Sequence, residues 1–169
     1  IPVVPIIQNC AVTPLSPLAR AVEVGRVLRD AIEAAPTDDR VAVIGAGPAG
    51  LAAAYQLRLR GHGVTIFDEH EELGGMMRYG IPGFRTPREM LDAEIKRIID
   101  LGVETRLKTR IGSDVSFEQI EKDFDAIFMA MGAQAGRPLP VPGAEAPNCV
   151  TAVAFLRAFN EGRLQHVGH

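Results

Sequence analysis

The sequence of 169 residues predicts an α/β domain built on a doubly wound parallel sheet, with an amino-terminal arm and helix before it. The run VAVIG at residues 41–45 is apolar and rich in β-branched side chains, which suits a parallel strand buried on both faces. An alanine-rich segment follows a glycine-rich turn and predicts a helix that ends at Gly61. The run HGVTIFD at residues 62–68 predicts a second buried strand. Strand, helix and strand together span about 30 residues, the size of one βαβ unit.

Residues 1–39 are expected to form an arm, a helix and a linker ahead of the domain at residues 40–169. Prolines punctuate residues 1–19, and apolar side chains recur at helical spacing over residues 18–34. Pro36 and the polar residues after it end that helix. The spacing leaves two roles open, because such a helix either packs on its own domain or serves as a surface for a partner.

A glycine-rich loop follows the second strand, and the next helix is expected over residues 86–101. Thr86 is its candidate cap, and Glu89 lies three residues further on, as in a capping box. Asp92 and Lys96 are one turn apart, which predicts an ion pair on the exposed face. The buried face is expected to consist of Met90, Leu91, Ile95, Ile98 and Ile99.

The remaining elements are shorter, and each follows from a local pattern. Ser116 and Gln119 form a second capping box, which predicts the start of a short helix. In chain order these elements are a strand at residues 103–111, that helix at 117–123, a buried strand at 126–130 and a helix at 150–161.

Composition excludes several classes of protein. The net charge is −3, so no basic footprint for nucleic acid is present. The two cysteines, Cys10 and Cys149, are far apart, which argues against a disulfide scaffold and an in-chain iron–sulfur cluster. The uncharged residues 1–19 contain prolines and lack a basic start, so they do not suit a signal peptide. Glycines and a proline interrupt the uncharged residues 41–57, so these do not suit a membrane helix of about 20 apolar residues. We expect a cytoplasmic protein.

The sequence offers no acid–base or nucleophilic set. Its four histidines are scattered, and none accompanies a serine or cysteine as in a catalytic triad. They are expected to be surface or hydrogen-bonded histidines, and they are His62, His70, His166 and His169. Such an absence fits a protein whose cofactor performs the chemistry while side chains bind and orient it.

The strongest motif is the G-x-G-x-x-G at residues 45–50, GAGPAG, which lies between a predicted strand and a predicted helix. Gly45 permits the tight turn, Gly47 lets a pyrophosphate approach the backbone, and Gly50 lets the helix pack closely on the strand. The phosphates of a dinucleotide would then lie at the positive end of that helix.

Asp68 ends the second predicted strand, near the spacing expected for the acid that binds an adenosine ribose. A carboxylate accepts a hydrogen bond from the ribose 2′-hydroxyl and repels a 2′-phosphate. The motif therefore favours NAD or FAD over NADP, and composition alone does not separate the first two. The alternative is a solvated aspartate at a strand end.

Four stretches carry a resemblance to a known family: VAVIGAGPAGLAAA, VTIFD, GGMMRYGIPGFR and FDAIFMAMGA. Over roughly residues 40–165 the chain resembles the first half of the FAD domain of the glutamate synthase small (beta) subunit family. That family includes the flavin module of dihydropyrimidine dehydrogenase. The stretch G-G-x-x-x-Y-G-I-P is the most specific part of the pattern.

The resemblance implies three groups of cofactor-binding residues. Those around the pyrophosphate and the adenosine ribose are Gly45, Gly47, Pro48, Ala49, Gly50 and Asp68. Those in the loop that passes the cofactor are Gly74, Gly75, Met76, Arg78 and Ile81. Those near the adenine and the last turn are Ile111, Met131 and Gly132, with Met131 in place of the usual threonine. For Arg78 the alternative is a solvated loop charge, and for Met76 it is ordinary apolar packing.

The implied function is that of the FAD-binding part of an NAD(P)H-linked oxidoreductase. By resemblance, hydride passes between a nicotinamide and the flavin, and electrons then pass to iron–sulfur clusters on partner subunits or on segments outside this chain. The NAD(P)-binding domain is expected downstream, so the chain is expected to be incomplete as an enzyme. Two alternatives stay open: an NAD-binding dehydrogenase domain without flavin, and a non-catalytic assembly subunit.

Overall fold

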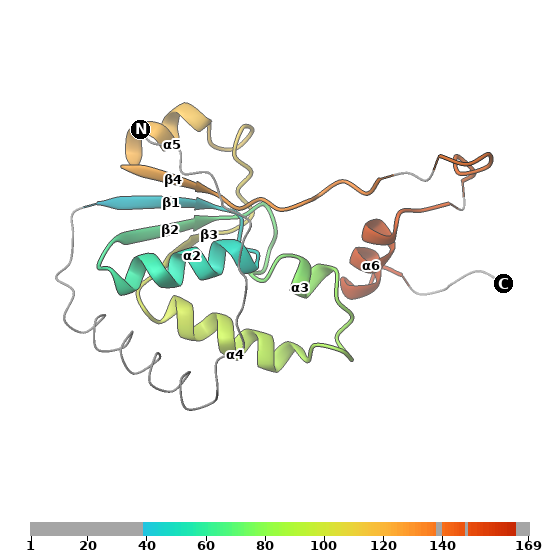
Figure 1. Cartoon of the computed structure of the whole chain (residues 1–169), viewed down its shortest axis with the longest axis horizontal. Helices are drawn as coiled ribbons and strands as arrows, with labels where there is room; N and C mark the ends of the chain where they lie inside the picture. The colour runs from blue at the N-terminus through green and yellow to red at the C-terminus, as the bar shows by residue number, and fades with distance from the viewer. Residues whose placement is uncertain (1–38, 138–139, 148, 165–169) are drawn as a thin grey trace, which may run out of the picture.

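The computed structural model describes residues 39–137, 140–147 and 149–164, and the expected arm and helix of residues 1–38 lie outside these ranges. Its sheet contains four parallel strands in the order β3-β2-β1-β4 (Figure 1). They are β1 (Arg40–Ile44), β2 (Gly63–Phe67), β3 (Glu104–Arg106) and β4 (Ala126–Met129). The strand order reverses at β1, which pairs with β2 on one side and β4 on the other. The predicted doubly wound parallel sheet is therefore confirmed.

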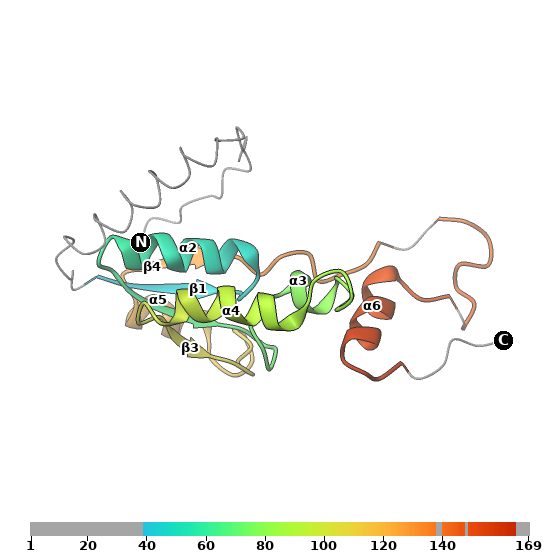
Figure 2. The ribbon, with the colours of Figure 1, turned by 90° about the horizontal axis from the view of Figure 1, so that it is seen from below.

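Helices cover both faces of this sheet. Two of them, α2 (Pro48–Leu59) and α4 (Arg88–Ile99), pack on one face, whereas α5 (Phe117–Asp123) packs on the other. The other two, α3 (Met76–Tyr79) and α6 (Ala152–Asn160), lie beyond the carboxyl ends of the strands (Figures 1 and 2). A hydrogen bond of 2.9 Å from Asn160 Nδ2 to the Tyr79 carbonyl joins these two short helices.

The sheet divides the core into two apolar clusters, because alternate residues of a strand face opposite sides. The cluster beneath α2 and α4 contains Val43, Ala46, Leu51, Ala54, Val64, Ile66, Leu91, Ile95 and Val103. The cluster beneath α5 contains Ala42, Ile44, Phe67, Ile120 and Ile127. After Arg40, all of β1 is buried. The strand that leads into the glycine turn is thus held from both faces.

The start of α4 differs from the prediction. Its N-cap is Pro87, with φ −53° and ψ 132°, and it makes no side-chain cap hydrogen bond. The capping box of Thr86 and Glu89 is therefore wrong, because the extended backbone at Pro87 delays the first helical turn. Met90 is also 68% exposed, whereas Leu91 and Ile95 are buried as expected.

The expected pair between Asp92 and Lys96 is wrong as well. Lys96 Nζ lies 2.6 Å from Asp100 Oδ1, one turn further along α4. Asp92 instead forms an ion pair with Arg78 of the preceding short helix, α3. A tertiary partner has replaced the local one, since the Arg78 side chain is only 10% exposed and points at α4.

The third strand is shorter than expected. β3 contains three residues, all exposed, at the edge of the sheet. Lys108 then adopts a positive φ of 52°, which is uncommon for a residue with a side chain and ends the regular ladder. Residues 107–115 are consequently a loop at the carboxyl edge of the sheet, where strand had been predicted up to residue 111.

Other boundaries agree closely with the prediction. Ser116 caps α5, and its side-chain oxygen accepts a hydrogen bond of 3.1 Å from Gln119 N–H. Thr151 caps α6 in the same way, from Ala154 N–H at 3.3 Å. Within the described part of the chain, no helix is both long and apolar enough to cross a membrane.

Candidate dinucleotide site

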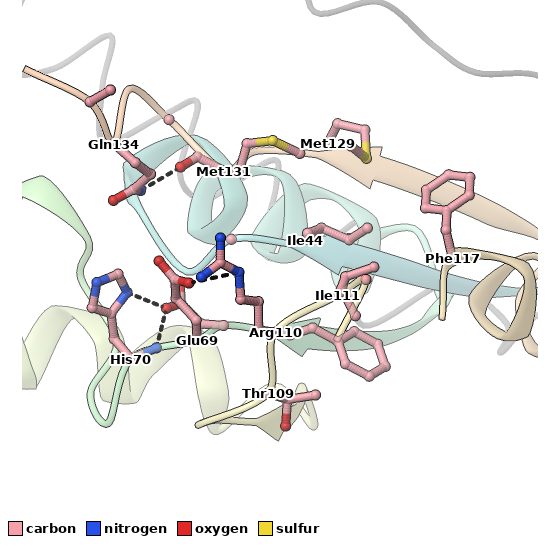
Figure 3. A pocket seen from close by; sticks show the side chains of 16 residues that line it. Ile44, Glu69, His70, Thr109, Arg110, Ile111, Phe117, Met129, Met131 and Gln134 are labelled. Carbon is pink, nitrogen blue, oxygen red and sulfur yellow. Dashed lines mark hydrogen bonds and ion pairs between the residues drawn. The ribbon is translucent and has the colours of Figure 1, made fainter. Parts of the chain in front are cut away.

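A pocket of about 600 Å³ opens at the carboxyl ends of β1, β2 and β4, where the strand order reverses (Figure 3). Ligands of open α/β sheets bind at this point. Residues from five separate segments line it: Ile44, Gly45, Phe67, Asp68, Glu69, His70, Thr109, Arg110, Ile111, Gly112, Phe117, Met129, Met131, Gly132, Gln134 and Ala135. The pocket thus gathers residues that are far apart in the sequence.

Two of the three fingerprint glycines are required by the packing of the protein itself. Gly45 has φ +108°, and a Cβ there would collide with the carbonyl of Ala130 after β4. A Cβ on Gly50 would collide with the carbonyl of Gly45. These two glycines let the turn, the helix and the neighbouring strand approach closely, as their assigned roles require.

Gly47 differs from its two neighbours in the motif. A Cβ at this position would meet one backbone atom, the Cα of Gly75, at an ordinary contact distance of 3.9 Å. Its φ of −74° is also accessible to any residue. Packing of the described residues therefore gives no reason for glycine at position 47.

A second glycine turn lies against the first. Gly74 N–H donates a hydrogen bond of 2.9 Å to the Ala46 carbonyl. Gly75 has φ +50°, and a Cβ there would lie 2.6 Å from the Cα of Gly47. The two turns therefore present backbone with few side chains around the start of α2, where Pro48 and Ala49 are exposed. An exposed helix N-terminus of this kind suits a phosphate.

Asp68 is buried beside the turn, with a side chain 9% exposed. Its Oδ2 accepts a hydrogen bond of 2.6 Å from Ala46 N–H. Its Oδ1 accepts one of 2.8 Å from His70 N–H and lies 2.7 Å from His70 Nδ1. The alternative of a solvated aspartate is wrong, and the carboxylate faces the pocket from a fixed position.

The walls of the pocket combine an apolar floor with a charged rim. Ile44, Ile111, Phe117 and Met129 provide side chains that suit a planar aromatic ring (Figure 3). At the rim, Arg110 Nε lies 3.6 Å from Glu69 Oε2. No set of three His, Cys, Asp or Glu side chains in the described ranges could hold a metal ion.

The other predicted site residues divide into those beside the pocket and those away from it. Met131 and Gly132 line the pocket with Ile111. Gly75 and Met76 line a second, smaller hollow of about 30 Å³ together with His70, Tyr79, Gln134, Val153 and Arg157. Met76 is 38% exposed and Met131 46%, so neither is packed in a core.

Arg78 and Ile81 line neither hollow. The Arg78 guanidinium donates to the Leu73 carbonyl at 2.6 Å, lies 3.2 Å from Glu72 Oε2 and pairs with Asp92. The alternative of a solvated loop charge is thus wrong, because this arginine ties the loop to α4. The Ile81 carbonyl accepts a hydrogen bond of 2.8 Å from Arg88 Nη2.

Several lining residues were not singled out from the sequence. Glu69 and His70 directly follow Asp68, and their position after the carboxyl end of a predicted strand could have identified them as pocket residues. Thr109 and Arg110 were assigned to a strand, and Gln134 had no motif. Among the histidines, His70 is buried and hydrogen-bonded, and His62 Nδ1 lies 3.5 Å from Asp39 Oδ2. His166 and His169 lie outside the described residues.

The parallel sheet, the paired glycine turns and the acid after β2 define a dinucleotide-binding domain of the Rossmann class. The chain belongs to the pyridine nucleotide-disulphide oxidoreductase family, whose model matches residues 39–168. The fold agrees with that of FprA from Mycobacterium tuberculosis, with a TM-score of 0.66 and 21% identity over 78% of this chain and 31% of that one. A structure of 2-naphthoyl-CoA reductase aligns with a TM-score of 0.57 and 29% identity, covering 80% of this chain and 20% of the other.

Sequence comparison confirms the resemblance to glutamate synthase small subunits. The chain is 45% identical over 120 residues to the glutamate synthase [NADPH] small chain of Mycobacterium tuberculosis, covering 71% of this chain and 25% of that protein. It is 47% identical over 126 residues to the NADP(+)-dependent formate dehydrogenase subunit beta of Moorella thermoacetica, covering 73% and 18%. The chain thus spans a quarter or less of the length of these two relatives.

Proposed function

We propose that this domain binds FAD and serves as the flavin-binding part of an NAD(P)H-linked oxidoreductase. The observation that carries the proposal is Gly47, where a Cβ would meet only the Cα of Gly75 at 3.9 Å, beside a second glycine turn and near the 600 Å³ pocket. A pyrophosphate at the start of α2 would fill the place that a Cβ of residue 47 would otherwise occupy. The adenosine half would then extend into the pocket toward Asp68, and the flavin half toward the loop that contains Met76.

The acid after β2 supports FAD in this pocket. A fixed carboxylate at Asp68 accepts a hydrogen bond from a ribose 2′-hydroxyl and repels a 2′-phosphate. The names of the two most informative relatives specify NADPH or NADP(+). A nucleotide with a 2′-phosphate therefore belongs on a different domain, and the pocket described here suits a second, unphosphorylated dinucleotide.

The role of this chain in the reaction is to bind and orient the cofactor. The first glycine turn and the N-terminus of α2 would hold the pyrophosphate, Asp68 the ribose, and Ile111 with its apolar neighbours the adenine. When bound, FAD supplies the redox chemistry, since it exchanges two electrons with a nicotinamide and single electrons with iron–sulfur centres. The exposed Met76 and Met131 would provide apolar contacts to the bound cofactor.

The partners follow from the same proposal. The NAD(P) site and the iron–sulfur clusters would lie on other subunits or on segments beyond this domain, as expected for a component of an electron-transfer complex. The rival functions predict different chromophores: an NAD-dependent dehydrogenase and an assembly subunit would both be colourless. A yellow protein with flavin absorption near neutral pH favours our proposal over both.

The decisive experiment compares Gly47→Ala with Gly63→Ala. Both substitutions meet only ordinary contacts, at 3.9 Å and 3.4 Å, but residue 63 lies at the opposite end of the sheet. We expect Gly47→Ala to weaken FAD at least about tenfold while Gly63→Ala does not. The measurements are flavin fluorescence during titration and the identity of cofactor released from the purified protein. Tightly bound NAD without flavin, or equal FAD affinity of the two variants, would overturn the proposal.

A further inference from the structure

We infer that His70 is a positioning residue for the dinucleotide site, which holds the Asp68 carboxylate in place to accept one ribose hydroxyl. The inference rests on the proposed function, in which the pocket binds an adenine dinucleotide with a free 2′-hydroxyl. It assigns a role to a histidine that shows no nucleophilic or metal-binding context in the sequence.

Asp68 receives donors on both of its oxygens. Oδ2 accepts the Ala46 N–H at 2.6 Å, and Oδ1 accepts the His70 N–H at 2.8 Å. The His70 ring nitrogen Nδ1 lies 2.7 Å from the same Oδ1. An ionised carboxylate only accepts, so Nδ1 must carry the proton and donate it.

These donors leave little capacity for a ligand. A carboxylate offers about four lone-pair positions, and the protein occupies three of them. The remaining position is on Oδ2, the oxygen that also bonds to the glycine turn. Asp68 therefore has room for a single ligand donor, which matches one ribose hydroxyl.

The His70 ring is itself held firmly. Its side chain is 8% exposed, and it packs on the Tyr79 ring with centroids 4.6 Å apart and planes inclined by 30°. The His70 carbonyl accepts a hydrogen bond of 3.0 Å from Lys108 N–H, which fixes the backbone. His70 lines the large pocket, where Figure 3 shows it, and it also lines the small hollow, so the residue lies between the two.

The hydrogen bond from His70 Nδ1 thus fixes the orientation of the Asp68 carboxylate. Without Nδ1, the Oδ1 atom of Asp68 would keep only its backbone donor, the His70 N–H. The carboxylate could then rotate about its χ2 torsion toward another hydrogen-bond donor. Rotation would move Oδ2 away from the ribose. The predicted effect of losing Nδ1 is weaker binding of a ribose 2′-hydroxyl in particular, with binding of the rest of the nucleotide preserved.

Three variants separate the donor from the ring. His70→Phe keeps the ring against Tyr79 and removes the donor. His70→Asn loses the ring but places its Nδ2 where Nδ1 of histidine lies. His70→Ala loses both the ring and the donor. If phenylalanine at position 70 disrupts folding, the comparison of His70→Ala with His70→Asn still isolates the donor. The probes are ADP and 2′-deoxy-ADP, titrated into the purified protein by calorimetry.

We expect His70→Phe and His70→Ala to bind ADP about tenfold more weakly than the wild type, the scale for one hydrogen bond to a charged group. These two variants should bind 2′-deoxy-ADP with the same affinity as the wild type. His70→Asn should bind ADP with the affinity of the wild type. In an Asp68→Ala background, His70→Phe should have no further effect, since the two residues act through one bond.

The alternative outcomes separate failure of the proposed function from failure of the inference. If ADP fails to bind the wild type, the proposed function and the inference both fail. If Asp68→Ala weakens ADP but His70→Phe does not, the inference alone fails. The inference also fails if His70→Asn is as weak as His70→Ala, because the ring would then matter and the donor would not.

Discussion

The Cα of Gly47 faces the Cα of Gly75, and the two positions tolerate a side chain unequally. A Cβ on Gly75 would lie 2.6 Å from the Cα of Gly47, whereas a Cβ on Gly47 would lie 3.9 Å from the Cα of Gly75. Gly75 also has φ +50°, a conformation that favours glycine. Packing of the described residues therefore requires glycine at position 75 but not at position 47.

The first prediction is that Gly75→Ala destabilises the protein and Gly47→Ala does not. Alanine at position 75 adds a steric collision to a backbone with positive φ, which costs roughly 1–3 kcal/mol. Urea denaturation of the two variants measures the difference in free energy of unfolding. Equal stabilities would show that the two turns separate without cost.

The second prediction concerns the acid after β2. Asp68→Ala should weaken FAD by roughly 1–3 kcal/mol, the scale of a hydrogen bond to a charged group. The exposed Glu121 provides a control, since Glu121→Ala removes a carboxylate outside the pocket. Affinities are compared by fluorescence titration of the apoprotein. An Asp68→Ala variant that binds like the control would remove Asp68 from the site.

The third prediction assigns Arg78 to stability. Its partners Glu72 and Asp92 are 62% and 55% exposed, so the ion pairs themselves contribute little. The larger loss in Arg78→Met is the bond to the Leu73 carbonyl, together with the buried guanidinium, and we expect roughly 1–3 kcal/mol. Thermal unfolding measures this loss, and Arg97→Met, at an exposed pair on α4, is the control. The assignment is wrong if both variants melt alike.

The fourth prediction is a pH dependence from Tyr79. Burial raises the pKa of the Tyr79 hydroxyl above its usual value of about 10. The unfolded chain then loses this proton at a lower pH than the folded protein. Stability from this group is present below about pH 10 and is lost as the pH rises through the folded pKa. The free energy of unfolding of the wild type minus that of Tyr79→Phe should therefore decrease between pH 9 and pH 11. A constant difference would contradict this.

Local patterns predicted the elements whose causes are local. Ser116 and Gln119 marked the start of α5 because a cap acts within one helical turn. The apolar runs marked β1, β2 and β4 because burial on both faces leaves a continuous pattern. The fingerprint glycines were assigned correctly for Gly45 and Gly50, since their roles depend on the adjacent strand and helix.

The features that sequence did not predict have distant causes. Asp92 pairs with Arg78, 14 residues away, and this contact depends on how the loop folds back on α4. The small helix α3 forms inside a glycine-rich loop, and its four residues are too few to show a helical pattern of apolar side chains. The contact between His70 Nδ1 and Asp68 Oδ1 was not predicted either, because no spacing rule identifies it. Thr109 and Arg110 line the pocket from a loop that follows the positive φ of Lys108, which the alternating pattern did not predict.

The position of β1 at the centre of the sheet has a consequence for the order of folding. Its end joins the end of β2 through the bond between Ala46 and Asp68, 22 residues apart, whereas its start joins the segment before β4 through Arg40 and Asp125, 85 residues apart. Closing the longer loop costs more chain entropy and delays the contact. The unit of β1, α2 and β2 should therefore form early, and the β4 side of the pocket should close last. In pulse-labelling hydrogen exchange, amides of β2 would become protected before those of β4.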